Sequence, residues 1–229
     1  MKRSAQESAF TLTDLLVMLA VLSVLAAVLV STLARMRGRT RQLRCASNLG
    51  QISKALQQYA NEHNKTLPNM KPGLSSGIWW LYKEQVKGYA GLKGPASAGD
   101  KLFACPNDRG YADEGEKPRP FCLSQKFSYG SYNFNGINLP GVPNIAGRDI
   151  ASITDPRRTL LVMEWVAHAP LSWHKSQTRK ANTPFYSDAE SVVGFVDGHV
   201  STIKIYFDGI NPAYTRDPIA GYDYKYSGD

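Results

Sequence analysis

Histidine and carboxylate side chains gather in the second half of the sequence and are the first candidates for chemistry. The residues are His168, His174 and His199, together with Glu164, Asp188 and Asp197. Zinc enzymes hold their metal with such side chains at close spacing, as in a His-Glu-x-x-His helix. The sequence has no such spacing, and no Ser-His-Asp motif, phosphate-binding loop or dinucleotide-binding loop. We therefore expect neither a catalytic metal nor an enzyme; an exported hydrolase would require the three histidines to converge in the fold.

Two further binding signals lie within the globular part. Calcium ligands could come from the carboxylates of Asp208, Asp217, Asp223 and Asp229. Their spacing lacks the D-x-D-x-D-G pattern of a calcium loop, so we expect no cofactor and keep calcium at Asp208, Asp217 and Asp223 as an alternative. Trp79 and Trp80 could stack on sugars, but aromatic residues of small glycine-rich domains more often fill the core.

Net charge separates the first part of the sequence from the rest. The chain has 229 residues with 27 lysines and arginines and 19 acidic residues, a formal net charge of +8. The first 60 residues carry eight basic and two acidic side chains, and thus +6 of that excess. A basic run beside an apolar segment meets anionic lipid head groups more often than DNA. We expect membrane lipid, and no nucleic acid, among the partners.

Residues 15–34 form a candidate membrane-spanning helix. These 20 residues carry no charge, and a helix rising about 1.5 Å per residue covers about 30 Å over that length, one hydrocarbon core. The hydroxyls of Ser23, Ser31 and Thr32 can bond to the helix backbone. A secretory signal has a shorter apolar stretch followed by a small-residue cleavage site, whereas Arg35 comes next here. We therefore expect an anchor that is retained.

An amphipathic pattern continues the helix beyond the apolar segment. Steps of three and four residues define one helical face, formed by Leu49, Ile52, Leu56, Tyr59 and His63. Gly38 weakens the helix by about 1 kcal/mol relative to Ala, and Pro68 marks its far boundary. The pattern predicts one helix from about Thr11 to His63, whose second half packs on a globular body.

Short strands and turns are expected after this helix. Apolar and β-branched residues predict strands at 158–166, 192–196 and 200–205. Asp197-Gly198 predicts a hairpin with a type I′ turn, in which both central residues need positive φ, and His199 after it should face solvent. We assign no structure to the tail from Asp208. The predicted fold class is α+β and pilin-like, with a long N-terminal helix packed on a small antiparallel sheet.

The three cysteines are Cys45, Cys105 and Cys122. In an exported body they predict one disulfide and one free thiol. Cys105 and Cys122 close the shorter loop and are the easier pair, whereas Cys45 with Cys105 would tie the helix to the body. The sequence leaves both pairings open.

Asp14 lies directly before the uncharged segment, where the bilayer makes an acid costly. The surrounding sequence AFTLTDLLVMLAVLSVLAAV resembles the processing and anchor segment of type IV prepilins and type II secretion pseudopilins. The resemblance implies cleavage between Ala9 and Phe10 by a prepilin peptidase, N-methylation of Phe10, and a charge pair between Asp14 and a neighbouring subunit's new amine. An opposite charge nearby lowers the cost of burying a carboxylate. Ala9 stands where the usual pattern has Gly, and Asp14 where it has Glu.

Later blocks of sequence extend the resemblance over most of the chain. They are RCASNLGQISKALQQYANEHNKTLP, LFACPND, SYGSYNFNG, RRTLLVMEW and VVGFVDGHV, in that order. Together they are similar to a large pseudopilin-like family of planctomycete and verrucomicrobial genomes, often named for a histidine before a terminal Asp-Gly. Ser187 occupies that position here, and His174 lies further upstream. The resemblance implies fold and topology more than a molecular role.

These patterns and the resemblance lead to one expectation for organisation and function. Residues 1–9 would be a leader, 10–34 a transmembrane helix, 35–66 its amphipathic continuation and 67–229 an extracytoplasmic pilin-like domain. We expect a structural subunit of the inner membrane, with its N-terminus cytoplasmic and its domain periplasmic or on the cell surface. Prepilin peptidase would process it, and other pilin or pseudopilin subunits would assemble with it into a secretion pseudopilus or pilus-like filament. The alternative is a signal-anchored, monomeric extracytoplasmic binding protein, for instance for glycans.

Overall fold

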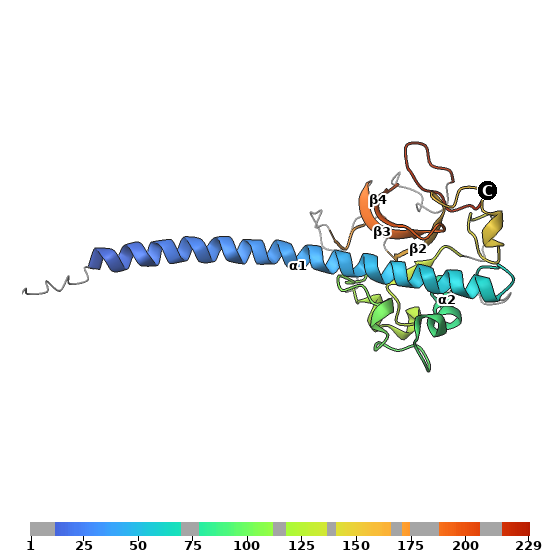
Figure 1. The fold of residues 1–229 in the computed structure, drawn as a ribbon, viewed down its shortest axis with the longest axis horizontal. Coiled ribbons are helices and arrows are strands. Elements are labelled where there is room, and N and C mark those ends of the chain that lie inside the picture. Colours follow the sequence, from blue (N-terminus) through green and yellow to red (C-terminus); the bar gives the residue numbers. More distant parts are fainter. Residues whose placement is uncertain are drawn as a thin grey trace, which may run out of the picture. The chain divides into compact units, whose positions relative to one another are not determined.

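The structure is a computed structural model that describes residues 12–69, 78–111, 118–136, 141–165, 171–174, 188–206 and 217–229. The chain divides into two compact units, residues 1–40 and 41–229. Within the described ranges the helices and strands are α1 (Leu12–Glu62), α2 (Ile78–Val86), β1 (Tyr132–Phe134), β2 (Leu160–Glu164), β3 (Ala189–Phe195) and β4 (Val200–Ile205). This combination confirms the α+β class (Figure 1).

α1 confirms the predicted long helix and spans 51 residues (Figure 1). Its fully buried face consists of Cys45, Leu49, Ile52, Leu56 and Ala60. The predicted face was therefore right for its first three members, whereas Tyr59 is partly buried and His63 is exposed. His63 instead stacks on the Tyr59 ring, with the ring centroids 3.9 Å apart. Gly38 has no atom within 4 Å of the place of a Cβ, so packing does not require a glycine there.

The helix ends at Glu62, one residue before the predicted end at His63 and short of the segment boundary placed at 66. Asn64 and Lys65 adopt positive φ angles of 51° and 64°, which a right-handed helix cannot contain. The Lys65 N–H donates to the Ala60 carbonyl at 2.8 Å, the hydrogen bond that closes a Schellman-type helix end. Local backbone conformation, and not Pro68, therefore ends the helix.

The four strands form one antiparallel sheet in the order β1-β2-β3-β4. β4 matches the predicted segment 200–205, while β2 and β3 overlap the segments predicted at 158–166 and 192–196. β1 was not predicted, because its three residues are too few for an alternating pattern to be recognised. In the view of Figure 1, β2, β3 and β4 lie on one side of the C-terminal half of α1 and α2 lies on the other.

The hairpin between β3 and β4 is where the sequence placed it, but its turn type differs from the prediction. Of the two central residues, Gly198 alone has a positive φ, at 93°. The Gly198 N–H donates to the Phe195 carbonyl at 2.9 Å, and the Phe195 N–H donates to the His199 carbonyl at 2.9 Å. This is a type I turn followed by a left-handed glycine, the three-residue hairpin that Asp-Gly also favours.

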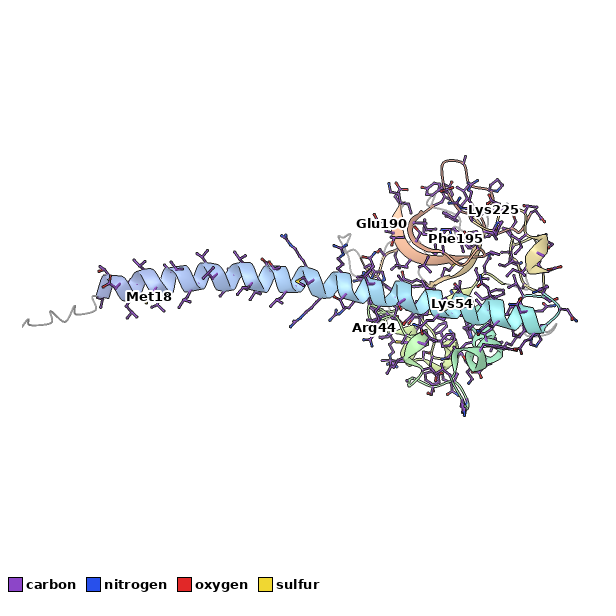
Figure 2. The ribbon with its side chains drawn as sticks, in the orientation of Figure 1. Met18, Arg44, Lys54, Glu190, Phe195 and Lys225 are labelled. Atoms are coloured by element: carbon purple, nitrogen blue, oxygen red, sulfur yellow. A yellow bond between two sulfur atoms is a disulfide. The ribbon has the colours of Figure 1, made fainter. Side chains whose placement is uncertain are left out.

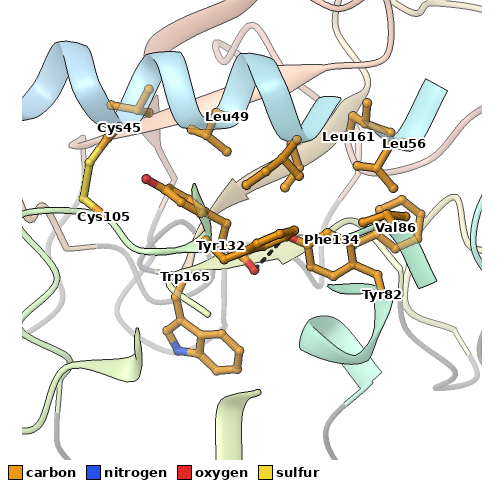
Figure 3. Close-up of a cluster of buried hydrophobic side chains, with 14 of the residues drawn as sticks. Cys45, Leu49, Leu56, Tyr82, Val86, Cys105, Tyr132, Phe134, Leu161 and Trp165 are labelled. Carbon is orange, nitrogen blue, oxygen red and sulfur yellow. Dashed lines mark hydrogen bonds between the residues drawn. A yellow bond between two sulfur atoms is a disulfide. The ribbon is translucent and has the colours of Figure 1, made fainter. Parts of the chain in front are cut away.

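The main core lies where α1, α2 and β1 meet (Figure 3). Leu49 and Leu56 of α1 face Tyr132 of β1 and Tyr82 of α2, and all four side chains are buried. The Tyr82 hydroxyl donates to the Tyr132 carbonyl at 3.1 Å, which satisfies its only proton donor in the core. α2 was not predicted, since its sequence begins inside a stretch rich in glycine, serine and tryptophan.

A second core covers the sheet with the end of the chain. It contains Leu160, Met163, Val193, Phe195, Ile205, Ile219, Tyr224 and Tyr226. The tail was expected to have no structure, yet residues 217–229 supply three of these side chains and form a bridge between Thr159 and Lys225. Aromatic side chains that looked solvated in the sequence are buried because they fit the apolar face of the sheet.

Lys83 of α2 is a buried cation with a full set of partners. Its Nζ lies 2.9 Å from Asp100 and donates to the carbonyls of Ser128 at 2.8 Å and Tyr129 at 3.2 Å. Burial lowers the pKa of Lys83, against the opposing effect of Asp100. Burial alone would raise the pKa of Asp100, but hydrogen bonds from Lys83 and the Ser97 N–H hold that pKa below its usual value. The pair ties α2 to two separate loops.

Replacing this cation tests its structural role. Lys83→Met should lower the free energy of unfolding by about 3–5 kcal/mol, because Asp100 would stay buried without its cation. Lys54→Met at an exposed position of α1 is the control and should change that free energy by less than about 0.5 kcal/mol. Urea unfolding of the detergent-solubilised chain, followed by tryptophan fluorescence, measures both. Equal midpoints for the two variants would contradict the assignment.

Candidate functional site

The apolar part of α1 is the first candidate surface. Its large apolar side chains between Leu12 and Leu33 are 50–77 % exposed, and they project in all directions around Met18 (Figure 2). In the described part of the chain, α1 is the one helix long and apolar enough to cross a membrane, and none of its most apolar window is buried. Such a segment is typical of a membrane anchor or of a signal sequence.

The hydroxyl groups of this segment bond inside the helix, as expected. Ser23 donates to the Ala20 carbonyl at 2.7 Å. Ser31 and Thr32 both donate to the Val28 carbonyl, at 2.9 Å and 2.8 Å. No hydroxyl proton of these three residues therefore needs a partner outside the helix, which suits a surface in lipid.

Asp14 lies in the first turn of α1 and is exposed. The partial positive charge at a helix N-terminus favours an anion there. Ala9 and Phe10, the predicted cleavage and methylation residues, lie outside the described residues. The structure adds that this carboxylate lies in the first turn of the same helix that contains the uncharged run 15–34.

Basic residues follow the apolar run directly on the same helix. The side chains are Arg35, Arg37, Arg39, Arg41 and Arg44, and each is exposed. Long arginine side chains can reach lipid phosphates while their methylene groups stay near the apolar boundary. The order of apolar run and basic run on one helix is therefore suited to the surface of an anionic membrane.

A disulfide joins Cys45 of α1 to Cys105, with their Cα atoms 5.2 Å apart (Figure 3). Of the two pairings that the sequence left open, this is the one that ties the helix to the body, and Cys122 remains free. Closing the loop between Cys45 and Cys105 costs only about 1 kcal/mol more in chain entropy than closing the shorter loop between Cys105 and Cys122. Packing of the folded chain therefore decides which pair forms. Burial and the neighbouring Asp108 carboxylate raise the pKa of the Cys122 thiol to about 11.

A buried acid–base pair lies against this disulfide. Glu164 is the last residue of β2, and its Oε1 lies 2.6 Å from His174 Nε2, with side chains 0 % and 3 % exposed. The other oxygen, Oε2, accepts the Val192 N–H of β3 at 2.9 Å. Cys105 Sγ lies 3.4 Å from Glu164 Oε1 and 3.8 Å from His174 Nε2. A disulfide sulfur has no proton to donate, so these two contacts are van der Waals contacts. Glu164 and His174 therefore form their hydrogen bond with each other and not with the sulfur.

Asn107 sets the orientation of the His174 ring. Its Nδ2 lies 3.0 Å from His174 Nδ1. When that amide nitrogen donates, the imidazole proton is on Nε2 and is donated to Glu164. Asn107 belongs to the LFACPND block, whose Asp108 accepts the Ser131 hydroxyl at 2.7 Å and holds the loop in place. The block therefore supplies the disulfide cysteine, the partner of the histidine and the residue that organises the loop.

Cys45, Cys105, Glu164 and His174 together form a group of potential metal ligands. Their donor atoms all lie within 4.8 Å of one another. Motif spacing could not reveal this group, because its members are 60, 59 and 10 residues apart along the chain. The sequence identified each residue separately, and the fold brings them together from four segments.

His199 lies in a different place from His174. Its Nδ1 is 2.6 Å from Asp197 Oδ1 on the β3–β4 turn, and its side chain is exposed, as the sequence predicted. Asp188 accepts the Tyr222 hydroxyl at 2.9 Å. His168 lies outside the described residues. Of the three candidate histidines, the two that are described therefore do not converge in the way that the hydrolase alternative requires.

The carboxylates considered for calcium have protein partners of their own. Asp217 accepts two backbone N–H groups of the tail, at 2.7 Å and 2.8 Å. Asp223 pairs with Arg158 at 2.8 Å and Asp229 with Arg148 at 2.7 Å, while Asp208 lies outside the described residues. Each of the three described carboxylates thus has a protein partner.

Trp80 has the packing role expected of an aromatic residue in this domain. Its ring centroid lies 5.1 Å from that of Phe127 and 5.0 Å from that of Trp165. The ring is partly buried. The side chain of Trp79 lies outside the described part of the structure. Stacking of Trp80 on a sugar would compete with these contacts.

The cysteine assignment can be tested by peptide mapping. Digestion without reduction should yield a peptide linking Cys45 to Cys105, with Cys122 as the one alkylatable thiol. In the folded chain at pH 8, alkylation of Cys122 should be at least about a hundredfold slower than in urea, because few thiols with a pKa near 11 are ionised there. A peptide linking Cys105 to Cys122 would contradict the assignment.

No protein-family model, curated protein or solved structure gave a significant match to the chain.

Proposed function

We propose that the chain is a membrane-anchored, pilin-like structural subunit that assembles through its N-terminal helix into a secretion pseudopilus or pilus-like filament. The observation that carries the proposal is one continuous helix with two different surfaces. Residues 15–34 of the helix are uncharged and exposed all round, and its C-terminal part from Cys45 supplies the buried face of a globular unit. A helix that is apolar all round needs lipid or other helices around it. Assembly would move the same surface from lipid to neighbouring helices.

Asp14 gives this assembly a fixed register. A carboxylate at the start of a lipid-facing helix is costly unless a cation lies close to it. Cleavage before Phe10 would create an amine four residues away in the sequence, and a neighbouring subunit displaced along the helix axis would present the same amine. The charge pair would then favour one stagger between subunits over all others.

The disulfide supports a location outside the cytoplasm. Disulfides persist in oxidising compartments, and Cys45–Cys105 lies in the globular unit that follows the apolar run. The cytoplasmic N-terminus and periplasmic domain rest on the resemblance of the leader. The exposed arginines after the apolar run would then meet lipid phosphates at the outer face of the membrane.

A structural role suits the buried cluster better than catalysis does. Glu164 and His174 form an acid–base pair, but their side chains are 0 % and 3 % exposed. A general acid or base has to come within hydrogen-bonding distance of its substrate. The pair therefore favours a role in holding the fold.

A monomeric, signal-anchored binding protein is the second candidate. It would use the same apolar helix only as an anchor and would bind its ligand with the globular unit. The packing of Trp80 into an aromatic cluster argues against the sugar-stacking form of this candidate. Its anchor would not depend on the charge of Asp14.

Substitutions at Asp14 distinguish the two candidates. Asp14→Asn keeps the shape of the side chain and removes its charge. It should lower the amount of cross-linked oligomer at least about tenfold, equivalent to ~1.4 kcal/mol per subunit contact. The monomer should stay in the membrane, because the apolar helix is unchanged. Asp14→Glu should retain assembly because the charge remains. Ser23→Ala is the matched control, since its hydroxyl bonds only within the helix. Formaldehyde cross-linking of cells of the native host, followed by immunoblotting, measures the oligomers.

If Asp14→Asn gives the same oligomer ladder as the unmodified chain and Ser23→Ala, the assembly proposal fails and the monomeric candidate takes its place. A loss of oligomers in both Asp14→Asn and Asp14→Glu would contradict the charge pair, because the carboxylate is present in the second variant.

A further inference from the structure

We infer that Cys45, Cys105, Glu164 and His174 bind one zinc ion when the disulfide between the two cysteines is reduced. Thiolate, imidazole and carboxylate are the side-chain ligands of zinc, and four of them make the closed tetrahedral site of structural zinc. The inference concerns the globular unit and does not depend on how the chain is anchored or assembled.

The distances in the cluster are already close to those of such a site. With Zn–S near 2.3 Å and Zn–N or Zn–O near 2.1 Å, the edge from a sulfur to a nitrogen or oxygen ligand is about 3.5 Å. Cys105 Sγ lies 3.4 Å from Glu164 Oε1 and 3.8 Å from His174 Nε2. On zinc binding the two sulfurs would separate to about 3.8 Å and the Glu164–His174 contact would widen to about 3.4 Å. Cys45 Sγ, which lies within 4.8 Å of the other three ligand atoms, would come to about 3.6 Å from the oxygen and nitrogen ligands.

The groups behind the ligands orient them as a metal site requires. The Val192 N–H holds Oε2 of Glu164 at 2.9 Å, which leaves Oε1 directed at the sulfurs. Asn107 holds Nδ1 of His174 at 3.0 Å, which leaves Nε2 directed at them. Zinc on Nε2 would place the imidazole proton on Nδ1, and a flip of the Asn107 amide would present its oxygen to that proton.

The ligand set offsets most of the charge of the metal. Two thiolates and one carboxylate carry three negative charges against the double positive charge of zinc, so the closed site would hold a net charge of only −1 in the core.

The disulfide and the zinc site make the same mechanical connection. The ligands come from α1, from the segment after the 3₁₀ turn Lys101–Phe103, from β2 and from residues 171–174. Zinc would therefore tie α1 to the globular unit as the disulfide does. The burial of all four side chains leaves no open coordination position, which is typical of structural and not of catalytic zinc.

The chemistry of the exchange balances with a phosphine as reductant. The phosphine attacks one sulfur and breaks the S–S bond, and water supplies both the oxygen of the phosphine oxide and the protons of the two thiols. Zinc then displaces these two protons into the buffer as it binds the thiolates. With zinc on Nε2 of His174, the imidazole carries its proton on Nδ1, reached by exchange with solvent.

Metal analysis of the full chain tests the inference. The chain is purified in detergent without a polyhistidine tag, reduced with the phosphine TCEP in the presence of Zn²⁺, and freed of excess metal. We expect one zinc per reduced chain and none per oxidised chain by elemental analysis. Co²⁺ in place of Zn²⁺ should give the visible bands of a tetrahedral site together with thiolate-to-cobalt charge-transfer absorption.

Matched variants assign the metal to these residues. Cys122→Ser should bind zinc like the unmodified chain, and the double variant Cys45→Ser/Cys105→Ser should bind none. Asn107→Ala keeps the disulfide and all four ligands but should weaken zinc binding about 10–100-fold, as loss of a group that orients a ligand does. Absence of zinc from the reduced chain, equal zinc in both redox forms, or zinc retained by the double variant would each overturn the inference.

Discussion

The buried face of α1 is the constraint on which the globular unit depends. Leu49, Ile52 and Leu56 are fully buried, in one core with residues of α2, β1, β2 and β3. Burying a large aliphatic side chain contributes roughly 1.5–3 kcal/mol. α2 has nine residues and β1 has three, so neither would be stable without this face. The globular unit is therefore assembled on the C-terminal part of this helix.

That helix has to suit two surroundings without a break. An α-helix satisfies its backbone hydrogen bonds internally, so it can continue from a lipid-like environment into a protein core. Side chains alone carry the change: apolar residues all round to Ala34, exposed arginines after it, and a buried face that begins at Cys45. The cross-link at Cys45 fixes the helix where the core begins. Glu164 and His174 pack against the same cross-link and bring β2 to that point.

How much the sequence predicts depends on the length of each pattern. α1 extends over many turns, so periodicity located it, whereas β4 was located by its apolar and β-branched residues directly after the Asp197-Gly198 turn. α2 and β1 are too short for a period, and the side chains of the tail are buried only because a sheet face is available. The Cys45–Cys105 pairing and the Glu164–His174 pair depend on tertiary packing. Residues 60 and 10 positions apart meet there, and no local motif encodes that contact.

The central claim is that one helix serves first as a membrane anchor and then as an assembly element, and the mature N-terminus tests it most directly. The chain would be purified from membranes of its native host, in cells with an active prepilin peptidase, and its intact mass and N-terminal peptide measured by mass spectrometry. We expect a chain that begins at N-methylated Phe10. A chain that begins at Met1 or Lys2 would contradict it, because Asp14 would then have no processed amine with which to pair.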